Sequence, residues 1–502
     1  MPQRAPVHRP SDSPVHRPSD SPGTAGPPPA GPGSADSGSA AAGSAPTSAI
    51  RGGIWGNYVD QIAIFLPLTA LAPAMVHIVG PEHAATSTSL ALIATLLGRP
   101  VGAMLFGRLA DRHGRTSITR WAIAGTALFT LLIAALPTHA ALGAGTLVLL
   151  FAFRFLGGMC LAGEYTSAIP LAMEWARPRS RGLFSGLIMA MAPWAQATIA
   201  LATAVSLAVL GPEAYAVFGW RIAFAAGGLA SLAMLVYYHL RVADAHTAPA
   251  EAAAQSRAGA QHAAAAGSLR SILAGSWAGA FWQVFTLMTG LWLMTNMVVV
   301  HLTSALGSGF SPAVTSPASV PLLMVAAGCA QALAMSCTGH LSTRLGRRRY
   351  FVLAGLLAAV AGPLCLAGIA GAQHIAAVVV LACAVQALTV SAYGPVGAYI
   401  NERFPAHLRS TGYGSAYSLS IIVPALFPFW LPPLGGLLGS DTTAVLVVAG
   451  TGGLLLALAG ACGPALRPAQ LDQSLDELSA QAIRDRSGGP AEAGADSAED
   501  DR

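Results

Sequence analysis

The sequence contains no lysine and little charge of any kind. All 27 residues counted as Lys or Arg are therefore arginine, and charged residues make up only 10% of the 502 positions, against about 25% in an average soluble domain. Hydrophobic residues reach 54%, and the mean hydropathy is +0.58. This balance excludes an ordinary soluble fold and indicates an integral membrane protein.

Signals of catalysis and of nucleic-acid binding are also missing. The six cysteines are scattered through apolar segments and behave as small core residues. We find no nucleophile–base pair, no His/Cys set with metal-ligand spacing, no phosphate-binding loop, and no basic patch with interleaved aromatic residues. The polar segments are too short and too low in complexity for a catalytic domain. We therefore expect neither an enzyme nor a nucleic-acid partner, and no metal.

Long apolar runs are what the sequence does have. About twelve runs of 18 or more residues lie between residues 53 and 464, each long enough to cross roughly 30 Å of hydrocarbon as a helix. Continuous runs of this kind exclude the alternating pattern of a β-barrel. Nearly all arginines fall on segments that would share one side of the membrane. The positive-inside rule then predicts an all-α protein of twelve transmembrane helices in the plasma membrane, with both termini cytoplasmic.

The chain also carries an internal duplication. Two motifs each occur twice, and the two copies are separated by nearly the same number of residues in both cases. One motif is a charged string, and the other contains an acid followed by an arginine. The first is Gly107-Arg-Leu-Ala-Asp111-Arg112-His-Gly114-Arg115, repeated as Gly339-His-Leu-Ser-Thr343-Arg344-Leu-Gly346-Arg347; the second runs from Glu174 to Arg181 and again from Glu402 to Arg409. Two six-helix pseudo-repeats are the usual frame of a secondary transporter, whose halves rock about a central site.

We divide the chain into five segments on this basis. They are a disordered cytoplasmic tail (1–50), an N-terminal six-helix bundle (51–241), a cytoplasmic linker (242–270), a C-terminal six-helix bundle (271–464) and a second cytoplasmic tail (465–502).

The repeated string resembles the signature of the major facilitator superfamily, G-x-L-x-D-R-x-G-R. In that family the loop makes charge contacts, with an acid at the end of the fourth helix, that hold the cytoplasmic side closed. The resemblance implies the major facilitator fold and a cytoplasmic gate formed by Gly107, Asp111, Arg112, Gly114, Arg115, Glu174, Arg344, Glu402 and Arg409. Because Thr343 replaces the acid, only the first half is expected to have the full clamp. The alternative is a solvated positive-inside loop.

Further strings look like the metabolite:proton symporter branch of that superfamily, which carries organic acids, betaines and similar solutes. They are Gly98-Arg99-Pro100-Val-Gly102, Arg154-Phe155-Leu-Gly157-Gly158, Gly163-Glu164, Gly219-Trp220-Arg221 and Asn401-Glu402-Arg403-Phe404-Pro405. The first helix departs from the family pattern, because Ala63 stands where a second acid is usual.

Four ionisable residues fall at membrane depth, where each costs about 2.5–3.5 kcal/mol on insertion scales. Asp60, Arg99 and Glu164 fall at similar depths and are expected to form one charge cluster, in which one carboxyl holds a proton in one transport state. A static ion pair is the alternative. The resemblance ties Arg154 to proton translocation or to the outer gate; alternatively it donates to backbone carbonyls of a kinked neighbour.

The second half offers its cavity only neutral groups, because no Asp, Glu or Arg occurs between residues 271 and 340 or between 350 and 401. Our candidates for solute binding are Asn57, Gln61, Trp282, Gln283, Asn296 and Tyr393. Any one of them can instead be ordinary helix packing.

Together these features predict a monomeric carrier that moves a small polar metabolite by alternating access in symport with protons. Two buried arginines favour an anionic solute such as an organic acid. The proton is the expected coupling ion, and no other cofactor is expected. The expected partners are the solute and the lipid bilayer. A proton-driven exporter of amphipathic compounds is the alternative with the same fold.

Overall fold

The computed structural model describes residues 36–80, 84–242, 272–316 and 319–465, with 473–475 and 477–478. The chain forms two units, Met1–Gly43 and Ser44–Arg502, and every candidate membrane span in these ranges belongs to the second. The first helix, α1 (Asp36–Leu66), starts before the boundary expected at residue 51. The predicted linker beyond Val242 and most of the predicted C-terminal tail lie outside the described residues.

Eleven helical spans in the described ranges are long and apolar enough to cross a membrane, or twelve if the pair Ala406–Ala425 and Phe427–Leu438, bent by 50°, counts as one span. All regular structure in these ranges is helical, as predicted. The spans of the first half are α1, α3 (Ala84–His113), α4 (Arg115–Ala134), α6 (Gly145–Trp175), α7 (Arg181–Leu210) and α9 (Trp220–Arg241). Those of the second half are α12 (Ala278–Thr295), α14 (Val320–Leu345), α15 (Arg347–Gly371), α16 (Ile375–Leu388) with α17 (Val396–Arg403), α18 (Arg409–Leu419) with α20 (Phe427–Leu438), and α21 (Asp441–Ala461).

Short helices complete or join these spans. They are α2 (Met75–Val79), α5 (His139–Leu142), α8 (Pro212–Ala214), α13 (Leu302–Gly307) and α19 (Ile422–Ala425). Wider π-helical turns occupy Pro67–Leu71, Tyr215–Gly219 and Asn296–His301, and tighter 3₁₀ turns occupy Ala72–Ala74, Pro178–Ser180, Val390–Tyr393 and Ala406–Leu408. Turns of these kinds mark places where the regular helical ladder is interrupted.

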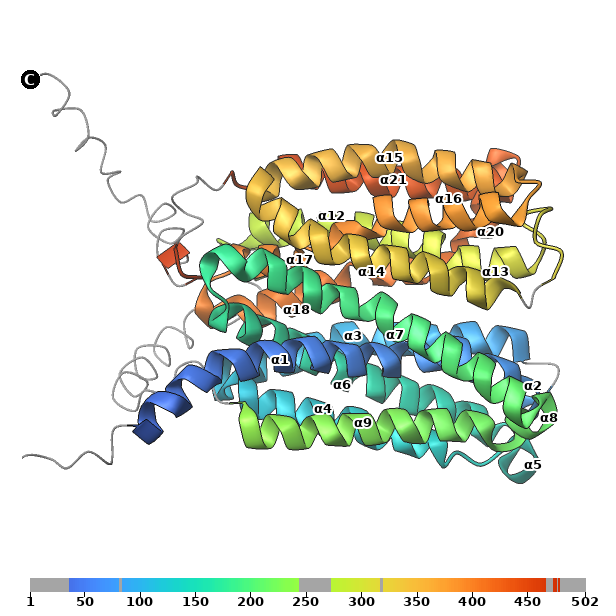
Figure 1. Cartoon of the computed structure of the whole chain (residues 1–502), viewed down its shortest axis with the longest axis horizontal. Coiled ribbons are helices and arrows are strands. Elements are labelled where there is room, and N and C mark those ends of the chain that lie inside the picture. The colour runs from blue at the N-terminus through green and yellow to red at the C-terminus, as the bar shows by residue number, and fades with distance from the viewer. Residues whose placement is uncertain are drawn as a thin grey trace, which may run out of the picture. The chain divides into compact units, whose positions relative to one another are not determined.

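The spans gather into two lobes that correspond to the two halves of the sequence (Figure 1). Two pairs of helices form the main contacts between the lobes, α7 with α14 and α18 with α3, and α6 and α17 add smaller contacts with α18 and α7. The two main pairs are related by the internal duplication, because they join the fifth span to the eighth and the eleventh to the second. The interface between lobes is therefore built twice from equivalent elements.

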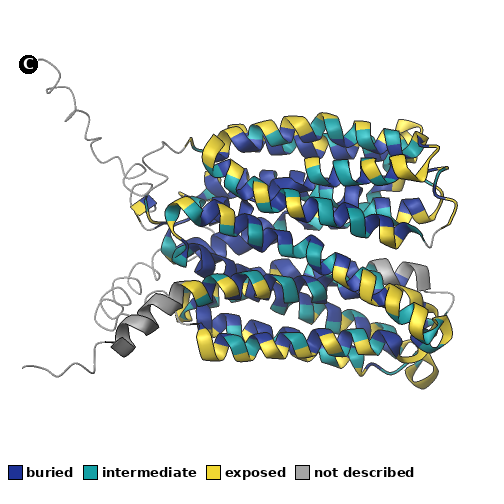
Figure 2. Ribbon diagram, viewed as in Figure 1, coloured by how far each residue is buried: buried dark blue, intermediate teal, exposed yellow. Residues whose placement is uncertain are grey.

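Exposed residues lie along the outward faces of the helices in both lobes (Figure 2), and many of them are large and apolar. Trp121, Leu322 and Leu437 are 71%, 72% and 83% exposed. In a soluble protein so much exposed apolar surface would drive association. Here it is the surface expected to face lipid, while the polar side chains that need partners are turned inward.

Candidate functional site

One end of the Ser44–Arg502 unit, which we call the arginine-rich end, is where α3 finishes and α18 begins. There the Asp111 carboxylate accepts hydrogen bonds from the backbone N–H groups of Ser410 (3.1 Å) and Thr411 (2.9 Å) and from the Thr411 hydroxyl (2.7 Å). The first N–H groups of a helix have no partner within the helix, and a negative charge there is favourable. Asp111 of the first lobe therefore caps a helix of the second.

The Glu174 carboxylate lies beside this cap and joins the lobes a second time. It forms ion pairs with Arg115 of its own lobe and with Arg409 of the other lobe. Arg115 also donates to the Ser410 hydroxyl and to the Ala406 carbonyl, both at 3.0 Å. Arg409 is fully buried, so its charge depends on these contacts rather than on water.

The duplication repeats this arrangement at Glu402. Its two carboxylate oxygens accept from the Arg347 guanidinium at 3.0 and 3.2 Å, and Arg181 of the first lobe lies 3.9 Å away. Arg347 and Arg181 are the sequence copies of Arg115 and Arg409. The ion pair is therefore present in both halves, but the full clamp, which includes an acid at the turn, occurs only in the first half, as predicted. What the second half lacks is the acid cap, since Thr343 accepts from Arg347 instead (3.2 Å).

The remaining predicted gate residues divide into two groups. Gly107 lies against α18, where a Cβ atom would come within 3.1 Å of the Thr411 Cα, and Gly114 turns the chain with φ +89°, a conformation that favours glycine. Arg112 and Arg344 are exposed. In the second half the arginine that meets Glu402 is thus Arg347, one position after the turn glycine, and not Arg344.

Asp60, Arg99 and Glu164 come together in the first lobe, as expected from their depths. Each is only 2% exposed. The carboxyl groups of Asp60 and Glu164 lie close enough to each other to interact, and Arg99 lies close enough to Asp60 to interact with its charge. One oxygen atom of each carboxyl group has no hydrogen-bond partner. Two buried carboxyl groups can form a hydrogen bond with each other only when one of them carries a proton, so this pair offers a place for one.

Arg154 has a different environment. Its guanidinium donates to the Thr95 hydroxyl (2.8 Å) and to the backbone carbonyls of Ala63 (3.0 Å) and Ile64 (3.4 Å). Pro67 has no N–H to offer to the Ala63 carbonyl, four residues before it, and α1 passes into a π-helical turn at this point. The contacts match the alternative interpretation, in which Arg154 serves a kinked neighbour.

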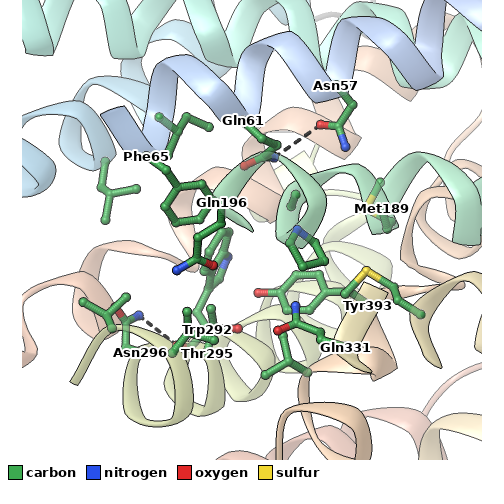
Figure 3. Close-up of a pocket in the computed structure, with 18 of the residues that line it drawn as sticks. Asn57, Gln61, Phe65, Met189, Gln196, Trp292, Thr295, Asn296, Gln331 and Tyr393 are labelled. Carbon is green, nitrogen blue, oxygen red and sulfur yellow. Dashed lines mark hydrogen bonds between the residues drawn. The ribbon is translucent and has the colours of Figure 1, made fainter. Parts of the chain in front are cut away.

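A cavity of about 90 Å³ lies between the lobes (Figure 3). Four predicted solute-binding residues line it, namely Asn57, Gln61, Asn296 and Tyr393. Trp282 and Gln283 do not. The Trp282 side chain is on the outer surface, 50% exposed, and the Gln283 amide is engaged with the Ala459 carbonyl (2.7 Å) and the Tyr399 hydroxyl (3.1 Å). Their place in the solute site is therefore a prediction that the structure corrects.

Arg99 also lines this cavity, in agreement with the expectation that a buried arginine favours an anionic solute. Three aromatic rings surround its guanidinium, with ring centroids at 5.3 Å (Tyr165), 5.9 Å (Trp292) and 5.5 Å (Tyr417). Contacts of this kind stabilise a desolvated cation by about 2 kcal/mol. Tyr165 and Tyr417 were missed by sequence reasoning, although Tyr165 directly follows Glu164. The rings come from both lobes, so the cation is held at their interface.

A second cavity, of about 410 Å³, continues from the first toward the end opposite the arginine-rich end. The two share Pro193, Gln196 and Val300 as lining residues. The remaining lining comes from residues 68–73, from Ala197 and Ala200 of α7, from Thr303 and Ser304 of α13, and from residues 321–328 at the start of α14. The unit is thus closed by ion pairs at one end and hollow toward the other.

Two helical lobes, a central cavity with a buried charge and an ion-paired closure at one end form an architecture that is typical of membrane transporters. The sequence model of the Major Facilitator Superfamily matches residues 59–320, more than half of the chain. The chain therefore belongs to the Major Facilitator Superfamily, and it is a metabolite transporter and not an enzyme.

Characterised relatives are similar to this chain over different lengths. The alpha-ketoglutarate permease of Escherichia coli is 26% identical over 379 residues, which cover 74% of this chain and 83% of the relative. The ectoine/proline transporter ProP of Corynebacterium glutamicum is 33% identical over 184 residues. This match covers 35% of this chain and 36%, about a third, of that relative. The glycine betaine/proline/ectoine/pipecolic acid transporter OusA of Dickeya dadantii is 26% identical, over 66% of this chain and 65% of the relative.

Solved structures agree on the fold. The proton:xylose symporter XylE, bound to 6-bromo-6-deoxy-D-glucose, superposes with a TM-score of 0.69 over 88% of this chain and 99% of that one, at 15% sequence identity. At this identity the likeness concerns the fold alone. It confirms the predicted major facilitator fold.

Proposed function

We propose that the protein carries a small carboxylate together with a proton across the plasma membrane, with the arginine-rich end on the cytoplasmic side. The observation that carries this proposal is the position of Arg99, which lines the central cavity and also faces the Asp60–Glu164 pair. A solute bound to Arg99 and a proton bound to the carboxyl pair therefore act on the same charge.

Charge balance explains why the two bind together. Arg99 and Arg154 supply two buried positive charges, and Asp60 and Glu164 supply two negative ones when both are ionised. When the carboxyl pair shares a proton, one positive charge is left over, and one carboxylate from the solute neutralises it. Because an unpaired charge at membrane depth is unfavourable, binding of the anion favours binding of the proton, and the reverse.

The same balance suggests a transport cycle. The solute and the proton enter from the hollow end while the arginine-rich end stays closed by the ion pairs that join the lobes, Glu174 with Arg409 and Glu402 with Arg181. Once the interior is neutral, the lobes rock about the cavity, the ion pairs separate, and both are released at the other end. No cofactor other than the proton is needed, and a monomer contains the whole site.

The relatives support a carboxylate solute. Alpha-ketoglutarate, proline, ectoine, glycine betaine and pipecolic acid, the solutes in their names, all contain a carboxylate. A guanidinium is the side chain best suited to pair with that group. The concentration of arginine in the segments expected at one side of the membrane supports the orientation that we propose together with the function.

Proteoliposomes test the proposal. The purified protein is reconstituted, a panel of carboxylates that includes 2-oxoglutarate, proline and glycerate is added outside, and proton uptake is followed with a pH-sensitive dye trapped in the vesicles. We expect solute-dependent acidification of the lumen, which Asp60→Asn and Glu164→Gln abolish and which the exposed control Asp441→Asn retains. Uptake that persists with a protonophore and in both variants would remove the symport.

An exporter of amphipathic compounds is the second candidate, because most residues that line the cavity are apolar, among them Leu92, Leu96, Val299 and Met335. A deletion strain separates the two. Increased susceptibility to amphipathic toxic compounds, without a defect in growth on any carboxylate, favours export over uptake.

A further inference from the structure

Three polar atoms buried around the central cavity have no hydrogen-bond partner. They are Arg99 Nε, the amide oxygen of Gln331 and the hydroxyl of Tyr393. The three residues are 2%, 5% and 6% exposed and come from α3, α14 and the 3₁₀ turn Val390–Tyr393, hence from both lobes. A buried polar group without a partner is destabilising by about 1–3 kcal/mol. A ligand that satisfies all three is therefore favoured.

Each atom requires a particular chemistry. The Arg99 guanidinium can only donate, and its charge calls for an anion. The Gln331 oxygen can only accept, so it requires an O–H or N–H group. The Tyr393 hydroxyl, which lies near Thr295, can donate to an oxygen or accept from a hydroxyl. Together the three describe a solute that carries one anionic group and at least one hydrogen-bond donor.

Several other polar side chains around the cavity already have partners (Figure 3). Gln61 donates to the Asn57 side chain (3.3 Å), Asn57 donates to the Ile188 carbonyl (2.5 Å), and Asn296 donates to the Trp292 carbonyl (2.8 Å). These contacts leave the Arg99, Gln331 and Tyr393 atoms as the groups most in need of a ligand.

The cavity has no place for a second charge. Arg99 is the one charged side chain among its lining residues in the described part of the chain. A second carboxylate on the solute would meet apolar or neutral groups, and so would an ammonium. Placing an unpaired charge there is strongly unfavourable, so the body of the solute should be neutral and its donor should be a hydroxyl.

The part of the cavity beside Arg99, Gln331 and Tyr393 is small, with a volume of about 90 Å³, and it continues into the larger cavity toward the hollow end. A small solute therefore fits beside these three groups. We propose, on the basis of the proposed function, that the solute is a small hydroxylated monocarboxylate bound through Arg99, Gln331 and Tyr393. It differs from alpha-ketoglutarate, which has two carboxylates and no donor, and from glycine betaine, which has a fixed cation and no donor.

Four three-carbon probes test this class, since each differs from the first in a defined way. Glycerate has one carboxylate and two hydroxyls, malonate exchanges the hydroxyls for a second carboxylate, propionate lacks hydroxyls, and glycerol lacks the carboxylate. Calorimetric titration of the purified full-length protein should show glycerate binding at least about tenfold more tightly than each of the others, the ratio expected from one or two hydrogen bonds.

Variants connect the preference to the two neutral residues. Gln331→Leu and Tyr393→Phe should each weaken glycerate binding by about 5- to 30-fold and leave propionate binding unchanged, because propionate has no hydroxyl to lose. The matched control is Gln386→Leu, which removes an amide that donates to the Val298 carbonyl (3.3 Å) outside the cavity lining and should preserve the glycerate preference.

The outcomes separate this inference from the function on which it rests. Propionate or malonate binding as tightly as glycerate, or glycerate failing to bind while another carboxylate is carried, overturns the solute class and leaves proton symport standing. A glycerate preference that survives both variants overturns the assignment of Gln331 and Tyr393. Tight glycerate binding without proton movement in proteoliposomes overturns the symport and retains the solute class.

Discussion

The guanidinium of Arg154 donates to the backbone carbonyl of Ala63 at 3.0 Å, and Pro67 is the reason that this carbonyl is available. In a regular helix the N–H of residue 67 would occupy it, but proline has none. A buried side chain on α6 thus replaces a missing backbone hydrogen bond in α1, and it fixes the bend at the point where the first span borders the cavity.

Arg154→Lys should therefore destabilise the protein although it preserves the charge. A lysine ammonium cannot reach the Thr95 hydroxyl and both carbonyls with the fixed fork of a guanidinium, so at least one buried acceptor loses its partner, at about 1–3 kcal/mol. The thermal unfolding midpoint in detergent should fall by several degrees. The same exchange at exposed Arg112 is the control and should leave the midpoint unchanged; equal midpoints for both variants would contradict this account.

Substitution of Arg344 and of Arg347, the arginines on either side of Gly346, should have clearly different effects. The Arg347 guanidinium donates two hydrogen bonds to the Glu402 carboxylate, whereas Arg344 is exposed. Arg347→Lys removes the two-pronged contact within the second lobe and leaves Arg181 of the first lobe, at 3.9 Å, as the nearer cation for Glu402. The ion pair between the lobes should therefore strengthen and favour the closed state. Labelling of a single cysteine on the buried side of the arginine-rich end should become slower in Arg347→Lys and stay unchanged in Arg344→Lys. Equal labelling rates in the two variants would show that Arg347 has no greater effect on the closed state than the exposed Arg344.

Sequence patterns predicted the fold because each of them reports a local property. Apolar length predicts a span, arginine location predicts sidedness, and the duplicated strings predict two lobes. Asp111 and Glu174 were identified for the same reason, because they stand in motifs at the ends of helices. Depth along a helix also brought Asp60, Arg99 and Glu164 together correctly, since rise per residue is fixed.

Rotation about the helix axis is what the sequence did not determine. Trp282 and Gln283 have the depth and chemistry of cavity residues, yet one faces outward and the other faces α21. The aromatic rings around Arg99 come from three spans far apart in sequence, so their meeting depends on how the lobes pack. Thr343 in place of an acid correctly predicted an incomplete second clamp, but the part that Arg347 takes in the ion pair with Glu402 was not foreseen.

Two closely packed glycines should distinguish contacts that keep the lobes closed from contacts that stabilise the fold. A Cβ atom on Gly339 would overlap the Gly182 carbonyl oxygen across the two lobes, whereas one on Gly102 would overlap the Met159 backbone within the first lobe. Gly339→Ala is thus expected to open the arginine-rich end with little loss of thermal stability, and Gly102→Ala to lower the unfolding midpoint. Gly436→Ala, where a Cβ would meet nothing within 4 Å, should do neither. An unfolding midpoint lowered most by Gly339→Ala would show that this contact maintains the fold rather than the closed state.

Ser185 provides the sharpest test of how the lobes close. Its hydroxyl donates to the Gly394 carbonyl (2.6 Å) and accepts from the Ala398 N–H (3.0 Å), two groups that would bond to each other in a continuous helix. A side chain of the first lobe is thus inserted into a backbone interruption of the second. Ser185→Ala leaves both groups without this partner while the lobes are closed, so the closed state should lose about 1–2 kcal/mol relative to the open one.

The population of the open state should then rise by about 5- to 30-fold, measured as the labelling rate of a single cysteine on the buried side of the arginine-rich end. Ser206→Ala is the matched control on the same helix, because the Ser206 hydroxyl donates to the Ala202 carbonyl of α7 itself (2.7 Å). If Ser185→Ala labels no faster than Ser206→Ala, the inserted hydroxyl does not hold the lobes together, and the Asp111 cap and the ion pairs between the lobes maintain the closed state without it.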